Sequence, residues 1–556
     1  MDIRFIDIFA GPGGLGEGFS RYGTYSNNRI KYKGVLSIEK DKVAADTLTL
    51  RNWVHQYDDR DLPNYYYEAL KDPEVFTKIH STPEWQRAKE VVWNAELGKV
   101  CEKELHERLQ KAIGGKEKWV LLGGPPCQAY SLVGRSRLTG MGMDAEKLNP
   151  KEATKARKDR EDRFYNDRRH ILYLEYLRIV AIHQPSVFVM ENVKGILSSK
   201  IPTTDGSQER IFPKIRADLA NPGKALVNDK VFNQLKQFHP TSHKTYKLYS
   251  FVCPFLGKEP ADQEFIIRCE NYGVPQSRHR VIILGIREDI EVASGILEQS
   301  RKINVRNILN NMPKLRSGLS KGGDSSISWL ATIRECFSEN TIQQLESLGV
   351  GGQLHKLLDR TQTSYTRGAS FITSKKRPKH SPFPVMDWIQ RHSPDGTIQH
   401  ETRGHMGSDL GRYMFASLMA QKNTVTPKLQ DWPIELLPKH RNISVNEETG
   451  IVSVSGFHDR FRVQAWDKPS TTITSHISKD GHYYIHPDPA QCRSLTVREA
   501  ARLQTFPDNY YFCGNRTQQY HQVGNAVPPY LAVQLADIVA VGFHFPECYT
   551  GLAKAP

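Results

Sequence analysis

The feature that most constrains the fold is an apolar, strand-like run that passes directly into a glycine turn. Residues 3–9 are rich in Ile and Phe, and Gly-Pro-Gly-Gly-Leu-Gly follows over residues 11–16. A second apolar run over residues 34–38 ends at Glu39. A G-x-G-x-x-G turn after a strand, with an acidic residue roughly 20 positions further on, is typical of a dinucleotide-type site on a parallel sheet. The glycines allow a close approach of backbone to ligand, and the carboxylate accepts hydrogen bonds from ribose hydroxyls.

Further strand-length runs recur along the first half of the chain. Residues 119–122 lead into a Gly-Gly-Pro-Pro-Cys loop, residues 187–190 lead into Glu-Asn-Val, and residues 281–286 form another apolar run. Residues 170–182 have helical spacing of apolar side chains between two of these runs. Strands that alternate with helices predict an α/β domain with a mainly parallel sheet.

This rhythm breaks at about residue 287 and returns near Leu495. The stretch between is rich in Ser, Gly, His and basic residues and shows weak periodicity. Thr496 to Glu499 then predicts a helical capping box, and a final apolar helix is expected to begin near Ala526. We therefore expect an α/β domain over residues 1–286, a smaller irregular domain over 287–460, and a C-terminal segment, 461–556, that returns to the first domain.

Composition narrows the class of protein. A chain of 556 residues with 38% hydrophobic residues is expected to form two or more domains with real cores. No run approaches the roughly 18 apolar residues of a membrane span, and Asp2 and Asp7 stand where a secretory signal needs basic and then apolar residues. An intracellular protein without membrane contact is expected. The net charge of +15 suggests a polyanionic partner such as nucleic acid. The eight cysteines form no CxxC pair, so no metal site is expected.

Four chemically distinctive residues follow predicted strands. They are Gly11, Glu39, Cys127 and Glu191. The carboxyl ends of parallel strands meet at one edge of a sheet, so these residues are expected to converge there. Cys127 follows two prolines, which fix φ and remove two backbone donors, so the thiol is expected on a stiff loop suited to a nucleophile. A carboxyl group at the end of a buried strand, as at Glu191, suits a proton donor or a hydrogen-bond partner of a ring nitrogen.

A cysteine, an acid and nearby arginines together suggest methylation of carbon 5 of cytosine. That carbon is a weak nucleophile, and thiolate attack on carbon 6 converts the ring into an enamine that can accept a methyl group. An acid at N3 stabilises the charge that the attack creates, and an arginine near O2 helps. The glycine turn would hold the methyl donor.

With these residues in view, the chain resembles the DNA (cytosine-5) methyltransferases, which use S-adenosyl-methionine. The matching segments occur in the family's order: Phe9-Ala10-Gly11-Pro12-Gly13-Gly14, Gly124-Pro125-Pro126-Cys127-Gln128, Glu191-Asn192-Val193, Gln276 with Arg278 and Arg280 as Q-x-R-x-R, the motif over residues 498–504, and the Gln-Val-Gly-Asn-Ala-Val-Pro-Pro motif over residues 522–529. The resemblance implies a Rossmann-like S-adenosyl-methionine-dependent domain with a smaller target-recognition domain.

The resemblance also implies roles for single residues. It implies catalytic roles for Cys127, Glu191, Arg278 and Arg280, cofactor contacts for Phe9, Ala10, Gly11, Gly13, Gly14, Glu39, Pro125 and Asn525, and substrate contacts for Gln128, Ser131, Asn192 and Gln276. The product would be S-adenosyl-homocysteine, with no metal involved. The target-recognition domain would be residues 287–460, which would read base edges in the major groove. Residues 130–169 would close over DNA, and the target cytosine would be flipped out of the duplex.

The implied partner is double-stranded DNA with a specific sequence, bound by a monomer. A restriction-modification role with a cognate endonuclease as genetic partner, or a solitary bacterial modification role, would place the protein in the cytoplasm at the nucleoid. Glu39 and Cys127 lie far apart for this family, so a Tyr-rich, charged insertion lies between them. Asp58, Asp59 and Asp61 are candidates for the acid that contacts the cofactor adenine.

Three other functions would explain some of these residues. A nicotinamide-dependent dehydrogenase explains the glycine turn and Glu39 but not Cys127 behind two prolines or the arginine pair. An RNA methyltransferase with the same cysteine chemistry stays open, although the large irregular domain favours duplex DNA. A DNA-binding protein without catalysis is disfavoured by the presence of Cys127, Glu191 and Arg280.

Overall fold

The computed structural model describes most of the chain. The described residues are 2–26, 30–57, 61–126, 168–202, 207–255, 257–290, 295–360, 364–374, 381–446, 448–456 and 459–541. Among them, no helix is both long and apolar enough to cross a membrane.

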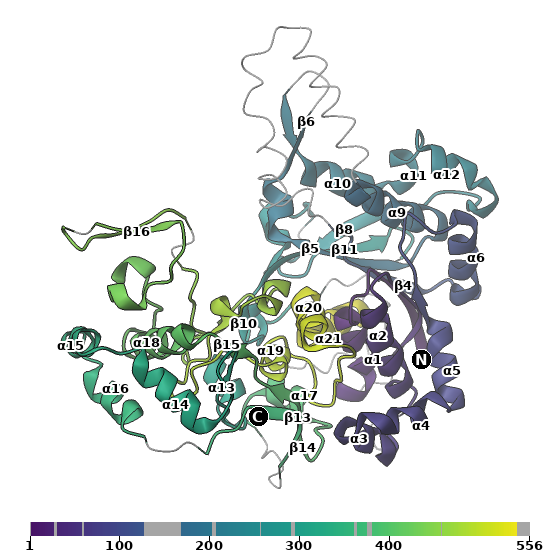
Figure 1. The fold of residues 1–556 in the computed structure, drawn as a ribbon. Helices are drawn as coiled ribbons and strands as arrows, with labels where there is room; N and C mark the ends of the chain where they lie inside the picture. The colour runs from purple at the N-terminus through teal and green to yellow at the C-terminus, as the bar shows by residue number, and fades with distance from the viewer. Residues whose placement is uncertain are drawn as a thin grey trace.

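An eight-stranded sheet forms the centre of the larger part of the molecule (Figure 1). Its strands are β1 (Asp2–Ile8), β2 (Lys31–Glu39), β3 (Val92–Asn94), β4 (Trp119–Gly123), β5 (Val187–Val193), β8 (Tyr246–Ser250), β9 (Ile266–Arg268) and β11 (His279–Arg287). The strand order is β3-β2-β1-β4-β5-β11-β8, and β9 also pairs with β11. The first five strands are mutually parallel, whereas β11 runs antiparallel to both β5 and β8. The predicted α/β fold with a mainly parallel sheet is therefore confirmed.

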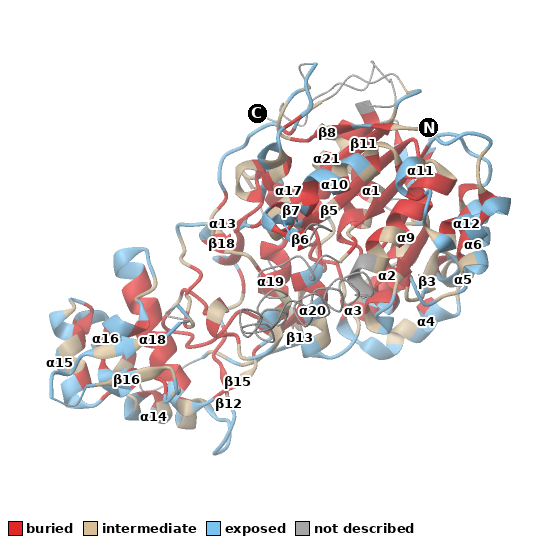
Figure 2. Cartoon of the chain, turned by 90° about the horizontal axis from the view of Figure 1, so that it is seen from above, coloured by how far each residue is buried: buried red, intermediate tan, exposed pale blue. Residues whose placement is uncertain are grey.

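Helices cover both faces of this sheet, because its central strands are apolar on both sides. In β4, Val120 and Leu122 join one core and Trp119 and Leu121 the other. The first core lies under α1 (Gly14–Tyr25), α19 (Val497–Leu503), α20 (Arg516–Asn525) and α21 (Pro529–Val541), and the second under α6 (Glu102–Ile113), α9 (Arg168–His183) and α10 (Ile211–Ala220). Figure 2 shows the buried residues concentrated in the sheet and in these helices.

The C-terminal segment returns to the sheet, as the sequence predicts. Thr496 forms the predicted capping box with Glu499 at the start of α19. The last helix begins at Pro529 instead of near Ala526, since Gly524 and Asn525 still belong to α20. Short helices α11 (Pro222–Ala225), α12 (Lys230–Gln234), α13 (Val305–Leu309) and α17 (Pro384–Gln390) complete this part of the molecule.

A second lobe stands beside the sheet domain (Figures 1 and 2). It contains α14 (Ser326–Glu335), α15 (Glu339–Ser347), α16 (Gly351–Leu358), α18 (Gly407–Asn423) and the hairpin of β16 (Ile443–Val445) and β17 (Val452–Val454). Its core runs from Trp329 to Cys492, whereas Val305 and Trp388 belong to the core of the sheet domain. The cores therefore divide the chain differently from the boundaries expected at residues 287 and 460.

The insertion between β2 and β4 forms a small aromatic core of its own. It contains α3 (Asn64–Lys71), α4 (Phe76–His80) and α5 (Pro83–Val91), which pack with α2 (Lys42–Val54). Trp53 and Tyr66 are fully buried in this core, which also includes Ile398. Ile398 belongs to β14 (Gly396–Glu401), the partner of β13 (Gly368–Thr373). The insertion thus connects the sheet domain to a hairpin from the middle of the chain. Short strands β6 (Lys200–Pro202), β7 (Gln208–Arg210), β10 (Gln276–Ser277), β12 (Gly318–Leu319), β15 (Gly404–His405) and β18 (Ser470–Thr471) make two-stranded pairs elsewhere.

The two ends of the chain pack closely against each other at Gly18 of α1. A Cβ at this position would lie 2.4 Å from Cβ of Ala532 and 2.5 Å from the backbone N of Val533 in α21. We expect Gly18→Ala to lower the free energy of unfolding by about 1–3 kcal/mol, because α21 must move away. Chemical denaturation measures this loss.

The control is Gly352→Ala in α16, where a Cβ would meet nothing within 4 Å. This change should be neutral or should stabilise the protein by up to about 1 kcal/mol through helix propensity. Equal stability of the two variants would contradict the close packing of α1 on α21.

Candidate active site

The glycine turn lies at the point where the strand order of the sheet reverses, between β1 and β4. Gly11 and Gly13 have φ values of 57° and 96°, which L side chains rarely adopt. A Cβ on Gly11 would meet nothing within 4 Å, so its backbone faces open space. A Cβ on Gly14 would lie 2.1 Å from the carbonyl oxygen of Val527, so the other end of the turn packs on the C-terminal motif. Parallel sheets bind ligands at such a switch point.

Glu39, at the end of β2, is bonded directly to this turn. Its Oε2 accepts a hydrogen bond from the backbone N of Gly11 at 2.8 Å, and its Oε1 accepts one from the backbone N of Asp41 at 2.8 Å. Burial raises the pKa of Glu39. The turn is also held to β2 by a bond of 3.2 Å from the N of Ala10 to the carbonyl oxygen of Ile38. Phe9, before it, has a φ of 57°.

The loop after β4 lies against Glu191 of β5. A Cβ on Gly124 would come within 2.9 Å of Glu191 Oε2, so a larger residue would displace the Glu191 carboxylate. Asn192, the next residue of β5, donates from Nδ2 to the carbonyl oxygen of Pro125 at 3.1 Å. Asn192 therefore fixes the loop instead of pointing into open space. Cys127, Gln128 and Ser131, the other predicted residues of this loop, lie outside the described residues.

Arg280 reaches the same edge because β11 runs antiparallel to β5. Ile282 pairs with Glu191 and Arg280 with Val193, so the start of β11 lies at the carboxyl end of β5. Arg280 Nε lies 2.8 Å from Glu191 Oε1, and the two side chains are 13% and 16% exposed. The structure thus brings a carboxylate and a guanidinium that are far apart in the sequence into one ion pair.

Gln276 and Arg278 are placed differently from the prediction of substrate and catalytic contacts. Arg278 is buried and donates to the carbonyl oxygens of Ile473 and Ala526, at 2.8 Å each, and to that of Gly524. Gln276 is also buried: its Nε2 donates to Gln504 Oε1 at 2.6 Å, and its Oε1 accepts from the N of Ile473 at 2.7 Å. Because these groups are used within the protein, we assign both residues a structural role that joins the sheet to the C-terminal motifs.

Asn525, the predicted cofactor contact of the C-terminal motif, is the last residue of α20 and is exposed. Of the three candidates for an adenine-binding acid, Asp58 and Asp59 lie outside the described residues, and Asp61 is exposed. Asn94, at the end of β3, pairs with Glu39 across the neighbouring strands β2 and β3. Its Nδ2 donates to the carbonyl oxygens of Glu39 and Lys40 at 2.9 and 3.1 Å.

Sequence reasoning missed Asp7, a buried acid in β1 beneath the turn. Its carboxyl accepts a hydrogen bond from the backbone N of Gly16, and its Oδ2 has no partner among the described residues. Burial raises the pKa of Asp7 to about 7, and the nearby charge of Glu39 acts in the same direction. An acid between two isoleucines, in the buried half of β1, was the available signal.

Sequence reasoning also missed Tyr510 and Arg51, which support the glycine turn. Tyr510 donates its hydroxyl to the carbonyl oxygen of Pro12, and its ring lies 4.4 Å from the guanidinium of Arg51. Arg51 in turn pairs with buried Glu17 of α1 at 2.6 Å. Burial alone would raise the pKa of Glu17, but the charges of Arg51 and His55 outweigh it and lower the pKa. Nothing in the spacing of these residues indicates the contact, since Tyr510 and Pro12 are at opposite ends of the chain.

Taken together, these features define an α/β enzyme with a nucleotide-type site at the carboxyl edge of its parallel strands. The family profile described as "C-5 cytosine-specific DNA methylase" matches residues 69–205 and 265–539. The chain belongs to this family, and it is a DNA (cytosine-5-)-methyltransferase.

Curated relatives align over nearly the whole chain. The type II methyltransferase M.Bpa9945I of Bacillus paralicheniformis is 28% identical over 558 residues, which cover 96% of this chain and 98% of the relative. The type II methyltransferase M.AgeI of Thalassovita gelatinovora is 24% identical, covering 97% and 99%. The DNA (cytosine-5-)-methyltransferase M.ApeKI of Aeropyrum pernix is 24% identical, covering 77% and 82%.

The buried position of Asp7 makes stability depend on pH. The carboxyl keeps its proton in the folded chain up to about pH 7, whereas it has its ordinary pKa of 3.8 in the unfolded chain. The stability that this group contributes is therefore present below about pH 4 and is lost as the pH rises to about 7. Asp7→Asn removes this titration. Relative to the wild type, the variant should gain up to about 1.4 kcal/mol per pH unit within this window. Denaturant unfolding at several pH values measures it, and a constant difference would contradict a raised pKa.

Proposed function

We propose that this enzyme transfers a methyl group from S-adenosyl-methionine to carbon 5 of a flipped-out cytosine in a specific double-stranded DNA sequence. The observation that carries the proposal is the convergence at one sheet edge of the glycine turn with Glu39, the loop after β4, and the Glu191–Arg280 pair. This reaction needs a site for the methyl donor, a loop that carries the nucleophile, and charged side chains that contact the cytosine ring.

The residues around the turn fit an adenosyl ligand. The backbone of Gly11 faces open space, and the Glu39 carboxylate stands beside it as an acceptor for ribose hydroxyls. We assign cofactor contacts to Phe9, Ala10, Gly11, Gly13, Gly14, Glu39, Pro125 and Asn525. S-adenosyl-methionine supplies the methyl group when bound and leaves as S-adenosyl-homocysteine.

For the chemical step, we assign the nucleophile to Cys127. Its thiolate adds to carbon 6 of cytosine, and the electron pair of the C5–C6 double bond becomes available for carbon 5 to take the methyl group. The proton of carbon 5 then leaves to a water molecule, and the Cys127 sulfur departs as the double bond re-forms. Gln128 and Ser131 of the same loop are assigned to the DNA.

Glu191 would hold the proton at N3 of the cytosine, and Arg280 would lie near O2. The ion pair of 2.8 Å between them supports this assignment, because each side chain fixes the other at the carboxyl end of β5, beside Gly124. Asn192 supports it further, since its bond to Pro125 keeps the loop against β5.

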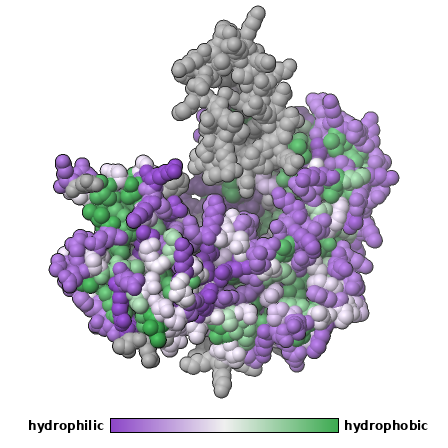
Figure 3. Space-filling view, in the orientation of Figure 1, coloured by the Kyte–Doolittle hydropathy of each residue, from purple (hydrophilic) through white to green (hydrophobic). Residues whose placement is uncertain are grey.

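We assign recognition of the DNA sequence to the second lobe. Figure 3 shows hydrophilic side chains over much of the surface where this lobe meets the sheet domain. The net charge of +15 for the whole chain suits binding of a phosphate backbone. Carbon 6 of a stacked cytosine is not accessible, so the base must leave the duplex. The names of relatives such as the type II methyltransferase M.Bpa9945I support a type II modification role. We further propose a cognate restriction endonuclease as genetic partner and a monomer as the form that acts on DNA.

The direct test of the nucleophile uses labelled S-adenosyl-methionine and duplex DNA. The wild type should transfer the label, and Cys127→Ser should reduce transfer below detection because a hydroxyl is a far poorer nucleophile than a thiolate. Duplexes with 5-fluorocytosine at the target should trap the wild type covalently, since fluorine cannot leave as the proton does. Trapping of the Ser variant would show that another residue attacks, and labelling of tRNA but not of DNA would overturn the substrate.

A second test addresses the support of the glycine turn. Tyr510→Phe removes the bond to Pro12, so we expect the KM for S-adenosyl-methionine to rise about threefold to tenfold with kcat little changed. Tyr511→Phe is the matched control, because the Tyr511 ring packs on Phe76 at 4.9 Å, away from the turn. A loss of kcat with unchanged KM would contradict a role of Tyr510 in shaping the cofactor site.

A further inference from the structure

The amino-terminal half of β2 is an open edge of the central sheet. β1 pairs with β2 from Lys31 onward, but β3 pairs with β2 only at Ser37, Ile38 and Glu39. Among the described residues, the stretch before Ser37 therefore has a neighbouring strand on one side only. The register with β1 shifts between Phe5 and Ile6, and this bulge leaves residues 31–34 as the regular part of the edge. Such an edge presents backbone N–H and C=O groups to any extended chain that reaches it.

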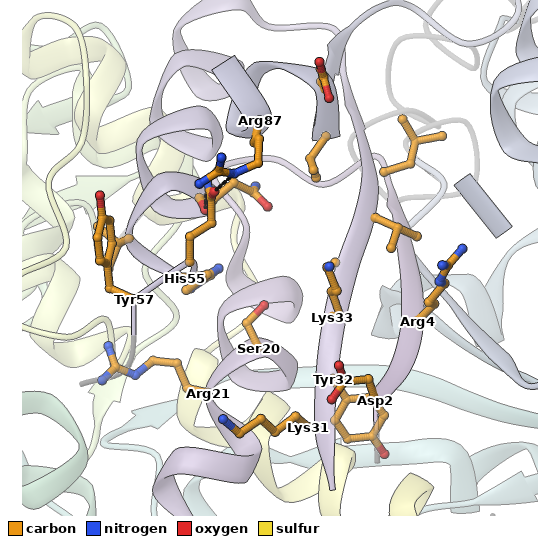
Figure 4. Close-up of a pocket in the computed structure, with 18 of the residues that line it drawn as sticks. Asp2, Arg4, Ser20, Arg21, Lys31, Tyr32, Lys33, His55, Tyr57 and Arg87 are labelled. Atoms are coloured by element: carbon orange, nitrogen blue, oxygen red, sulfur yellow. Dashed lines mark hydrogen bonds between the residues drawn. The ribbon is translucent and has the colours of Figure 1, made fainter. Parts of the chain in front are cut away.

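A cavity of about 1060 Å³ runs along this edge. One wall is β2 itself, and the others come from α1, α5, α6 and the turn after α2. In the close-up, Lys31, Tyr32 and Lys33 extend from one strand, with Arg21, His55 and Arg87 on the helical segments around it (Figure 4). The groove lies at the amino ends of β1 and β2, opposite the edge that carries Glu39. We call it the β2-edge groove.

The charged residues that line the β2-edge groove are mainly basic. Its cationic residues are Arg4, Arg21, Lys31, Lys33, Arg87, Arg108 and Lys111, and its acidic residues are Asp2 and Glu90. Arg4 donates to the carbonyl oxygens of Ala112 and Ile113 at the end of α6, and Arg87 and Arg108 pair with Glu84 and Glu104. Lys33 and Lys111 form no ion pair with other described residues and remain exposed.

We propose that the β2-edge groove binds an extended acidic segment of a partner protein, which adds to β2 as a further strand. Residues 31–34 would supply main-chain hydrogen bonds, and acidic side chains at alternate positions of the added strand would face Lys33 and Lys111. The same lysines repel a second copy of this edge, so a self-association through β2 is disfavoured. Duplex phosphates would meet the lysines but would leave the backbone edge unpaired.

This binding is separate from the methyltransferase reaction. The two sites lie at opposite ends of the parallel strands, so an occupied groove leaves the Glu191–Arg280 edge open.

The test uses a fluorescent decapeptide of alternating Glu and Val as the probe, with the full-length protein. Fluorescence anisotropy measures binding at up to about millimolar peptide, and hydrogen exchange measures protection of residues 31–34. We expect binding with slower exchange at these amides. The same peptide with N-methylated valines carries equal charge but cannot complete the ladder, and it should bind at least about tenfold more weakly.

Charge reversal gives the second arm. Lys33→Glu should weaken peptide binding about tenfold, because it sets like charges against each other, with methyl transfer unchanged. Lys247→Glu is the matched control, since Lys247 is an exposed lysine of β8 at the opposite edge of the sheet. Equal binding of the N-methylated peptide, protection elsewhere than residues 31–34, or no binding at all would overturn the proposal. A loss of duplex DNA binding by Lys33→Glu, without loss of peptide binding, would assign the groove to DNA instead.

Discussion

The buried guanidinium of Arg278 joins three parts of the chain that together surround the site. It lies just before β11, donates to the carbonyl oxygen of Ile473, which belongs to the core of the sheet domain, and donates to those of Gly524 and Ala526 at the end of α20. Gln276, two residues before Arg278, joins the same parts of the chain through hydrogen bonds with the Gln504 side chain and the backbone N of Ile473. Carbonyl oxygens buried at such a junction need donors, and an arginine can serve several at once. The sheet, the segment around Ile473 and the C-terminal motifs therefore depend on one another for their positions.

The glycine turn is supported by a buried ion pair and a tyrosine that pack against it. Glu17, Arg51 and Tyr510 connect α1, α2 and the segment after α19 to Pro12, and Tyr66 of the insertion donates to the carbonyl oxygen of Asn509 at 2.6 Å. The insertion therefore has a structural consequence, because it holds the residue next to Tyr510. Removing one partner of a buried ion pair leaves the other charge buried without a counter-charge, which lowers the stability of the fold.

The sequence predicted the parts of the site that follow from strand order. A glycine turn and Glu39 at the ends of neighbouring parallel strands must meet, and the structure joins them by a bond of 2.8 Å. Glu191 and Arg280 also meet, although Glu191 lies within β5 and Arg280 arrives on an antiparallel strand. Gln276 and Arg278 could not be placed in this way. Their direction depends on the pairing of β10 with β18, about 190 residues later in the chain, and local patterns carry no signal of such a contact. The core of the second lobe was missed for the same reason, since it combines helices with loop segments as distant as Phe461 and Cys492.

The central claim is that the converging groups at the carboxyl edge methylate carbon 5 of cytosine within one DNA sequence. Bisulfite sequencing of duplex DNA exposed to the purified protein and S-adenosyl-methionine tests it most directly, because it reports the modified atom and the sequence context together. The account predicts cytosines resistant to conversion at one position of one recurring sequence. Complete conversion of every cytosine, or resistance spread over unrelated sequences, would contradict it.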